Sequence, residues 1–150
     1  MDTSSTSNHG SLIQYFVPAQ SAQVAFITSG PDGNLWFQSG LEPSCSIAKM
    51  NTNGVTLAQY PIPNYNISSL ASGPNNALWA TSANEMPPDG LYSIYSITTA
   101  GTLTVYDLPT GYSYPTYITD GPGGNLWFYE AKGTFVLVLG FLFDCINTTP

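Results

Sequence analysis

The sequence predicts an all-β protein built from three repeated units, each a small antiparallel sheet. A ten-residue segment ending in tryptophan occurs three times, at 27–36, 70–79 and 118–127. Its tryptophans lie 43 and 48 residues apart, a period typical of architectures in which one repeat forms one small sheet. No stretch has the periodicity of an amphipathic helix, so we expect strands throughout.

Two further motifs recur at the same period and in the same order. One begins with tyrosine and ends with proline, at 15–18, 60–63 and 106–109. The other is a trio of residues at 50–52, 97–99 and 146–148. Together the motifs divide the chain into units 10–53, 54–100 and 101–150, preceded by a polar leader at 1–9.

Each repeated segment contains a tight turn between two strands. Proline sets φ for the second position of the turn, and we expect positive φ two residues later, at Gly33, Asn76 and Gly124. The strand before the turn is expected at 24–28, 70–71 with its lead-in, and 117–119. The aromatic strand after it is expected at 35–38, 78–81 and 126–129.

A third strand is expected to end at Met50, Ile97 or Ile146, and a turn at Gly54 or Gly101 leads to a fourth. Proline ends this fourth strand and lacks an amide donor, so the strand belongs at a sheet edge. Four short antiparallel strands per unit are typical of a propeller blade. The predicted fold is a partial β-propeller of three four-stranded blades, with both blade faces covered and all three tryptophans in the core.

Composition argues against a nucleic-acid partner. Lys49 and Lys132 are the only basic residues, and the net charge of −7 cannot neutralise a row of phosphates. A hydrophobic content of 43% over 150 residues suffices for one domain with a core. The apolar run at 135–143 is too short to span a bilayer and is the segment most prone to aggregate.

Few charges and many Ser, Thr, Asn, Gly and Tyr residues are typical of extracellular β proteins, so a secreted or cell-surface location is favoured. The leader lacks the basic flank and apolar stretch of a signal peptide, which leaves a cytoplasmic location open. Cys45 and Cys145 have no zinc-type spacing, so we expect no metal site. A disulfide between them requires the first and third units to come close.

The segments at 30–37 and 121–128, Gly-Pro-x-Gly-Asn-Leu-Trp-Phe, joined to the Tyr-x-x-Pro and Ile-x-Thr motifs, resemble the streptogramin lyase (virginiamycin B lyase) propeller family. The resemblance covers about residues 10–130. It implies a seven-bladed propeller of about twice this length. It also implies an elimination that linearises cyclic depsipeptide antibiotics, with a magnesium ion, a histidine base and glutamates near the central axis.

The aromatic strand of this family ends in Leu-Trp-Phe-Thr-Glu, and here the glutamate position holds Ser39, Ser82 and Glu130. The single histidine, His9, lies in the polar leader. Because elimination needs a base beside the abstracted proton, we expect a binding or scaffold module without complete catalytic machinery. Two alternatives stay open: a magnesium-dependent lyase active only when oligomeric or full-length, and a surface protein that binds carbohydrate.

Candidate ligand-binding residues fall into three groups. Glu130 and Tyr129, with Lys132, lie where the central mouth is expected, and Glu42 and Glu85 lie in corresponding loops. Tyrosines in the connections to the inner strands could stack a sugar or an aromatic ligand; they are Tyr65, Tyr112, Tyr114 and Tyr117. Asp32 and Asp120 flank the glycine turns and are predicted turn formers, because the alternating oxygen ligands of a calcium loop are missing.

The order of the motifs predicts self-association. An edge-type strand at 11–17 comes first, and the last motif at 146–148 stops short of the edge strand that the third unit needs. Three blades cannot close a ring without strain, so closure is expected only by self-association or within a longer chain. In a head-to-tail dimer each 11–17 strand would complete the partner's third blade. A small molecule or a glycan is the other expected partner.

Overall fold

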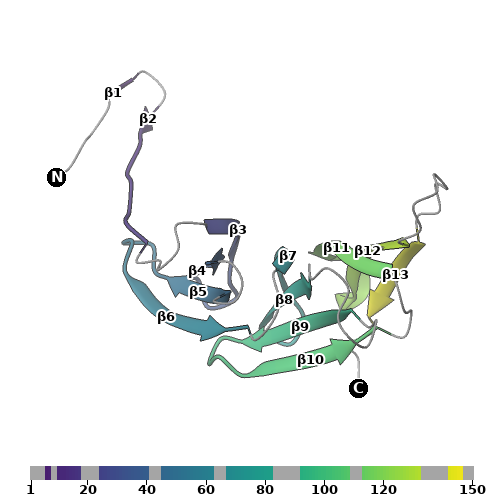
Figure 1. Cartoon of the computed structure of the whole chain (residues 1–150). Helices are drawn as coiled ribbons and strands as arrows, with labels where there is room; N and C mark the ends of the chain where they lie inside the picture. Colours follow the sequence, from purple (N-terminus) through teal and green to yellow (C-terminus); the bar gives the residue numbers. More distant parts are fainter. Residues whose placement is uncertain are drawn as a thin grey trace.

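The chain forms antiparallel sheets that lie side by side in an arc (Figure 1). This computed structural model describes residues 6–7, 10–17, 24–40, 45–62, 67–82, 92–108, 113–132 and 142–146. The first sheet has the order β3-β4-β5-β6, and its strands are Val24–Ser29, Leu35–Ser39, Ser46–Met50 and Thr56–Pro61. A small hairpin of β1 (Thr6–Ser7) and β2 (Gly10–Ser11) precedes it.

The second sheet repeats this order, with strands β7 (Ile67–Gly73), β8 (Ala77–Ser82), β9 (Ser93–Thr98) and β10 (Leu103–Asp107). The third sheet contains β11 (Ser113–Asp120), β12 (Leu126–Lys132) and β13 (Leu142–Ile146), with the short 3-10 turn η1 (Pro122–Gly124) between the first two. We call the first strand of each sheet its inner strand. The inner strands β3, β7 and β11 lie along one side of the arc, and β6 and β10 form the opposite side (Figure 1).

The all-β class, the antiparallel sheets and the aromatic strands after each turn are confirmed. Positive φ is found at the three expected turn positions, 75° at Gly33, 55° at Asn76 and 72° at Gly124. Two expectations need correction. The inner strands β7 and β11 are longer than predicted, because backbone pairing across a β-bulge extends each one toward its N-terminus. The third sheet has three strands among the described residues, with β13 at its edge, rather than four.

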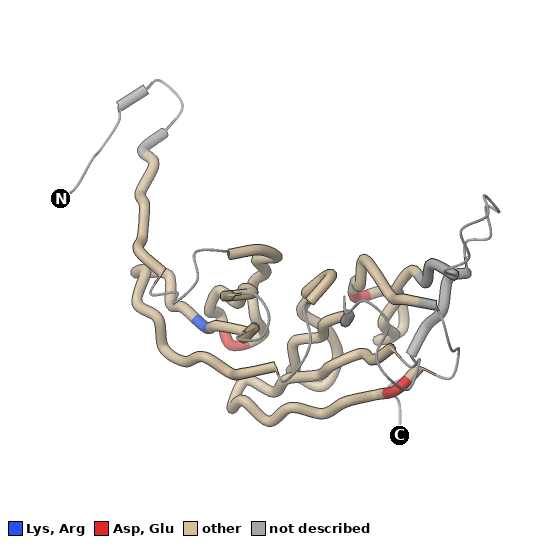
Figure 2. The backbone as a smooth tube through the Cα atoms, in the orientation of Figure 1, with Lys and Arg blue, Asp and Glu red and all other residues tan. Residues whose placement is uncertain are grey.

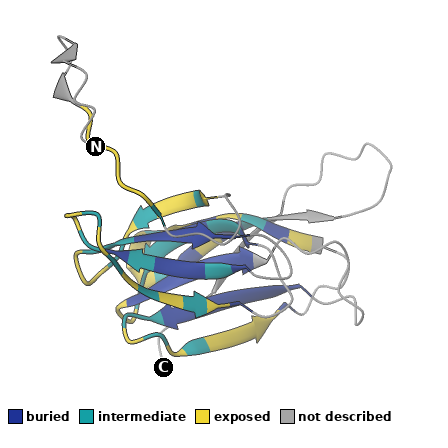
Figure 3. Ribbon diagram, turned by 60° about the vertical axis from the view of Figure 1, so that its left-hand side comes forward, coloured by how far each residue is buried: buried dark blue, intermediate teal, exposed yellow. Residues whose placement is uncertain are grey.

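The adjacent leucine and tryptophan of each aromatic strand point to opposite faces of the sheet, so they belong to different core clusters. Leu78 lies in a cluster shared with the first sheet, whereas Trp79 lies in a cluster shared with the third. Both are at most 2% exposed. Buried residues are therefore concentrated in the middle strands (Figure 3), and the core consists of layers between sheets rather than one central mass.

Trp127 is the exception to the predicted tryptophan core. Trp36 and Trp79 are 0% and 2% exposed, but Trp127 is 38% exposed. In the first two sheets, the face that carries Trp36 or Trp79 packs against the following sheet. Trp127 lies on the equivalent face of the third sheet. No sheet follows the third one among the described residues, so this tryptophan keeps contact with solvent.

Each of the two buried tryptophans stacks on a tyrosine from the outermost strand of its own sheet. The Trp36 and Tyr60 rings lie 5.6 Å apart, and the Trp79 and Tyr106 rings 5.4 Å apart. Tyr60 also lies directly over Gly101, in the turn between β9 and β10 of the second sheet, where an added Cβ would overlap its ring. A tyrosine thus links the core of one sheet to the outer turn of the next.

No helix in the described ranges is long and apolar enough to cross a membrane.

Replacing Gly101 with alanine should lower the free energy of unfolding by about 2–3 kcal/mol, because the new methyl group collides with Tyr60 and φ is +94°. Gly33→Ala is the matched control, since φ there is +75° and nothing lies within 4 Å of an added Cβ. It should cost only about 1 kcal/mol of backbone strain. Urea unfolding followed by tryptophan fluorescence measures both, and equal losses would contradict the Tyr60 contact.

Candidate functional site

The inner strands carry the most unusual backbone in the protein. Each one has a β-bulge opposite the aromatic strand, where its register with that strand shifts. At two of these bulges an aromatic residue has positive φ, 48° for Phe26 in β3 and 50° for Tyr117 in β11. Bulky residues rarely adopt this conformation, which costs about 1–3 kcal/mol and persists only where the surroundings enforce it.

Both aromatic side chains are exposed. Phe26 is 42% and Tyr117 is 77% exposed. The inner strand β7 lies between β3 and β11 and contacts both. Phe26 and Tyr117, on the two inner strands that flank β7, are the candidate ligand contacts of this protein, because they offer stacking area without a packing role.

The second sheet fixes the bulge around Tyr117 from both sides. The Ser68 hydroxyl donates to the carbonyl oxygen of Pro115 at 2.8 Å, and the Ile118 amide donates to Ser69 Oγ at 3.2 Å. Ser68 Oγ also lies 2.7 Å from Thr81 Oγ1. Hydrogen bonds at 115 and 118 therefore hold the chain on each side of Tyr117, which explains how the strained φ is maintained.

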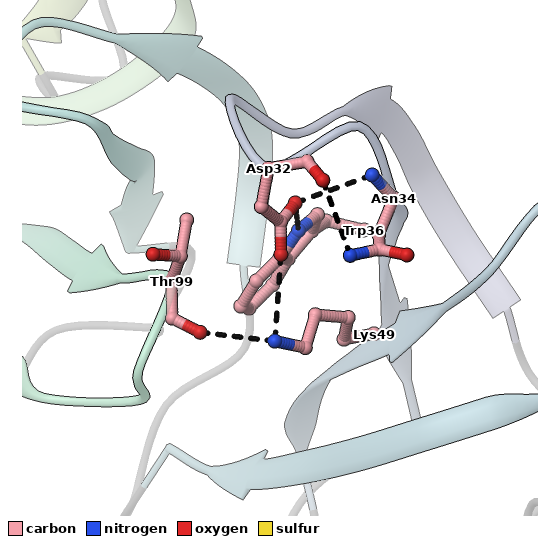
Figure 4. Close-up of polar contacts among 5 residues, drawn as sticks. All are labelled: Asp32, Asn34, Trp36, Lys49 and Thr99. Atoms are coloured by element: carbon pink, nitrogen blue, oxygen red, sulfur yellow. Dashed lines mark hydrogen bonds and ion pairs between the residues drawn. The ribbon is translucent and has the colours of Figure 1, made fainter.

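Asp32 forms the best-defined polar cluster, at the turn between β3 and β4 (Figure 4). Its Oδ1 accepts hydrogen bonds from Trp36 Nε1 at 2.9 Å and from the Asn34 amide at 3.2 Å. Lys49 Nζ lies 3.4 Å from Asp32 Oδ2 and 5.1 Å from the Trp36 ring centroid. The same ammonium donates to the Thr99 carbonyl oxygen at 3.0 Å, across the gap to the second sheet.

Burial raises the pKa of the Asp32 carboxyl, but hydrogen bonds from Trp36, Asn34 and Lys49 outweigh that effect and lower the pKa from 3.8 to about 2. The carboxylate is thus charged at any physiological pH. Its acceptor oxygens are already used to orient the turn, the tryptophan and the lysine. Asp32 is a turn former, as predicted, and it also anchors the contact between the first two sheets.

Charged side chains are sparse on the described surface, as Figure 2 shows. Besides Asp32, two carboxylate side chains are described. Asp107 accepts a hydrogen bond from Ser93 at 3.0 Å, and Asp120 is exposed. Within the described ranges no three His, Cys, Asp or Glu side chains gather in a way that could hold a metal ion. The magnesium ion that the family resemblance implies stays a prediction, because the side chains of Glu42, Glu85 and Glu130 lie outside the described part of the chain.

The structure places only part of the predicted ligand-binding set. Glu130 and Tyr129 lie on β12, opposite Pro115 and Thr116 of β11, and Tyr129 is half-buried. Tyr114 lies on β11 with its ring 5.9 Å from that of the buried Tyr92, on the second sheet. These positions share the junction of β11 and β12. The predicted residues Glu42, Glu85, Tyr65 and Tyr112 lie outside the described residues, as does the side chain of Lys132.

Three features were not predicted from the sequence. Tyr114 lies on strand β11 rather than in a connection, because pairing begins at Ser113, four residues before the strand predicted from Tyr117. The link from Lys49 to Thr99 joins residues 50 positions apart, and the only sequence signal for it was that Lys49 is one of two cations. The strained φ of Phe26 has no signal in the sequence at all.

The geometry defines a class of protein: successive antiparallel sheets with inner strands side by side and tryptophan layers between them form a propeller-like array. The virginiamycin B lyase family profile matches residues 2–137, and the chain belongs to this family. The resemblance found in the repeat motifs is thereby confirmed.

Solved structures with a related fold include a streptogramin B lyase, with 33% sequence identity and a TM-score of 0.61 over 76% of this chain. The match covers 36% of the streptogramin B lyase, so the chain spans about a third of its length. Two structures of virginiamycin B lyase from Staphylococcus aureus match at 22% identity. One is a catalytically inactive form with quinupristin, with a TM-score of 0.45 over 90% of this chain and 59% of that one.

The other is a selenomethionine-substituted form, with a TM-score of 0.46 over 92% of this chain and 61% of the other. No curated protein matches the sequence.

The Asp32→Asn variant should lower the free energy of unfolding by about 1 kcal/mol at pH 6, because it removes the charge paired with Lys49. The Asp32 pKa is depressed in the folded state, so its contribution is present above pH 4 and disappears as the pH falls toward 2. Urea unfolding at pH 6, 4 and 2 tests this. A wild-type advantage that persists at pH 2 would contradict the assignment, and the exposed Asp120→Asn is the control.

Tyr117→Gly should be more stable than Tyr117→Ala by about 1 kcal/mol, because glycine adopts a φ of 50° without strain whereas alanine does not. Both variants remove the same exposed ring, so lost packing cancels in the comparison. Thermal unfolding of the two proteins measures the difference. An alanine variant as stable as the glycine variant would show that the bulge relaxes in solution.

Proposed function

We propose that this chain is a binding module of a streptogramin-lyase-like propeller that holds a cyclic depsipeptide without cleaving it. We take the exposed side chains of Phe26 and Tyr117, on the inner strands β3 and β11, as its ligand contacts. The observation that carries the proposal is the pair of strained, exposed aromatic residues on inner strands that contact the same neighbour, β7.

Membership of the virginiamycin B lyase family supports this ligand class, since the 33% identical relative is a streptogramin B lyase. Cyclic depsipeptides present aromatic and apolar groups on a rigid ring, and such ligands lose little conformational freedom on binding. Exposed Phe and Tyr rings provide complementary stacking surface. Charged residues are sparse in the described part of the chain, which suits a largely uncharged ligand (Figure 2).

The proposed absence of cleavage is supported by the hydrogen bonds that already occupy the Asp32 carboxylate. Elimination requires a base within hydrogen-bond reach of the abstracted proton. Asp32, whose pKa is lowered to about 2, is a poor base, and its oxygens are occupied by Trp36, Asn34 and Lys49. The single histidine of the chain, His9, lies outside the repeats.

Isothermal titration of the protein with a streptogramin B antibiotic should show binding that Tyr117→Ala weakens about tenfold or more, the loss of one stacked ring. Asp120→Asn, a substitution of an exposed residue on the same strand, is the matched control and should bind as wild type.

Mass spectrometry of the same mixtures with added Mg²⁺ should recover the antibiotic ring intact. Linearised product would overturn the non-cleaving role and favour the lyase alternative. A wild-type protein that shows no binding heat, while a glycan array gives signal that depends on Tyr114, would overturn the ligand class and favour carbohydrate.

A further inference from the structure

The turn between β5 and β6 contains an asparagine followed by glycine, Asn53-Gly54, a pair that occurs nowhere else in the sequence. Because glycine has no side chain to shield its nitrogen, that nitrogen reaches the side-chain amide of a preceding asparagine more readily than the nitrogen of a bulkier residue does. Asn53 is exposed, and its side-chain amide makes no hydrogen bond with the residues that the structure describes. The two groups that react in an intramolecular deamidation therefore lie together at the end of a hairpin.

The turn at Asp32-Gly33 shows what protects a similar pair. The Asp32 carboxylate accepts a hydrogen bond from Trp36 and forms an ion pair with Lys49. These contacts hold the carboxylate in place, and its negative charge makes it a poor target for a nucleophilic nitrogen. The Asn53 side chain is neutral and has none of these contacts within the described ranges.

Asn51 holds the reactive turn closed. Its carbonyl oxygen accepts a hydrogen bond from the Gly54 amide at 3.0 Å, and its Oδ1 accepts from the amides of Asn53 and Val55, each at 3.0 Å. The Gly54 nitrogen attacks only after it has lost its proton, so its hydrogen bond to Asn51 has to open first. The Asn51 side chain therefore slows the reaction but does not prevent it.

The second sheet contains the same turn with an unreactive residue in it. Between β9 and β10 the Gly101 amide donates to the Thr98 carbonyl oxygen at 2.8 Å, and Thr98 Oγ1 accepts from the Thr102 amide at 3.0 Å. Ala100 occupies the position of Asn53 and is likewise exposed. Alanine is thus accommodated at this position of the turn, and it has no side-chain amide to lose.

We propose that the Gly54 nitrogen attacks Cγ of Asn53 and converts this residue to isoaspartate. A bond forms between the Gly54 nitrogen and Cγ, and the bond from Cγ to Nδ2 breaks. Solvent carries the proton that Gly54 loses to the departing nitrogen, which leaves as ammonia. Water then opens the resulting cyclic imide at either carbonyl carbon and gives isoaspartate or aspartate. Water is the only co-reactant.

Isoaspartate adds a methylene group to the main chain and a negative charge to the turn. The hydrogen bonds from Gly54 and Val55 to Asn51 both enclose the altered linkage, so the longer main chain disrupts them. Tyr15 is affected too, because its ring lies against Gly54 where an added Cβ would overlap it. The modification therefore loosens the end of the β5–β6 hairpin and its contact with Tyr15. This inference does not depend on ligand binding.

Wild-type protein kept at mildly alkaline pH should accumulate isoaspartate in the peptide that contains Asn53, measured by mass spectrometry and by labelling with an isoaspartate methyltransferase. Asn53→Ala, which copies Ala100, is the matched control and should lose this label while keeping the turn. No isoaspartate in the wild-type peptide, or total label in Asn53→Ala equal to that of wild type, overturns the site.

Asn51→Ala tests the restraint on the turn. This variant should deamidate about tenfold faster than wild type, because the turn opens more easily without the two hydrogen bonds to the Asn51 side chain. Circular dichroism at the incubation temperature checks that the variant is folded, so that the faster rate reports the turn alone. A rate equal to that of wild type would show that Asn51 does not restrain the reaction.

Asn53→Asp separates the change in the main chain from the change in charge. Freshly prepared, this variant carries the added carboxylate on an ordinary peptide linkage. Hydrogen exchange at the amides of Gly54 and Val55 should be about tenfold faster or more in the chromatographically isolated isoaspartate form than in Asn53→Asp. Equal exchange in the two proteins would overturn the proposed loosening of the hairpin.

Discussion

The structure depends on the stacking of one tryptophan and one tyrosine at the boundary between successive sheets. Such pairs contribute about 0.5–1.5 kcal/mol beyond the area they bury, and they also set geometry. Tyr60 reaches from the outermost strand of the first sheet over Trp36 and onto Gly101 of the second. Glycine is required there because any side chain would occupy the place of the ring. The distance between the two sheets at this point therefore depends on the thickness of the Tyr60 ring and on the absence of a side chain at Gly101.

This contact explains why the sheets have similar structures although the sequences between their shared motifs differ. Between the repeats, loops vary in length, but the tryptophan, the glycine turn and the tyrosine-to-proline strand keep their order. The inner strands are less constrained by this contact. Their bulges take different residues, Phe26 and Tyr117 among them, and it is there that exposed aromatic surface accumulates. The scaffold and the variable surface therefore occupy different strands of the same sheet.

Much of the fold could be predicted from the sequence, because the repeat gives the length of each unit and the turn residues mark where strands end. The Gly-Pro segments predicted both the turn positions and the positive φ of Asn76, which depend on local chemistry alone. The exposure of Trp127 could not be predicted from its motif, since burial depends on whether another sheet follows.

The candidate site was less predictable for the same reason. Phe26 lies at a bulge in the pairing of β3 with β4, and the bulge at Tyr117 is flanked by hydrogen bonds between the second and third sheets, so both depend on contacts between distant segments. The link between Lys49 and Thr99 likewise joins two repeats.

Lysine occurs at only one of the three equivalent positions, which distinguishes one junction from the others. Lys49, Ser96 and Cys145 each pair with the tryptophan of their sheet, yet only Lys49 bridges to a neighbouring sheet with an ammonium group. Repeat proteins are prone to misassembly because similar units can pack out of sequence. The Lys49 ammonium and the Thr99 carbonyl therefore give the junction of the first and second sheets a charged contact that differs from the neutral hydrogen bonds between the second and third.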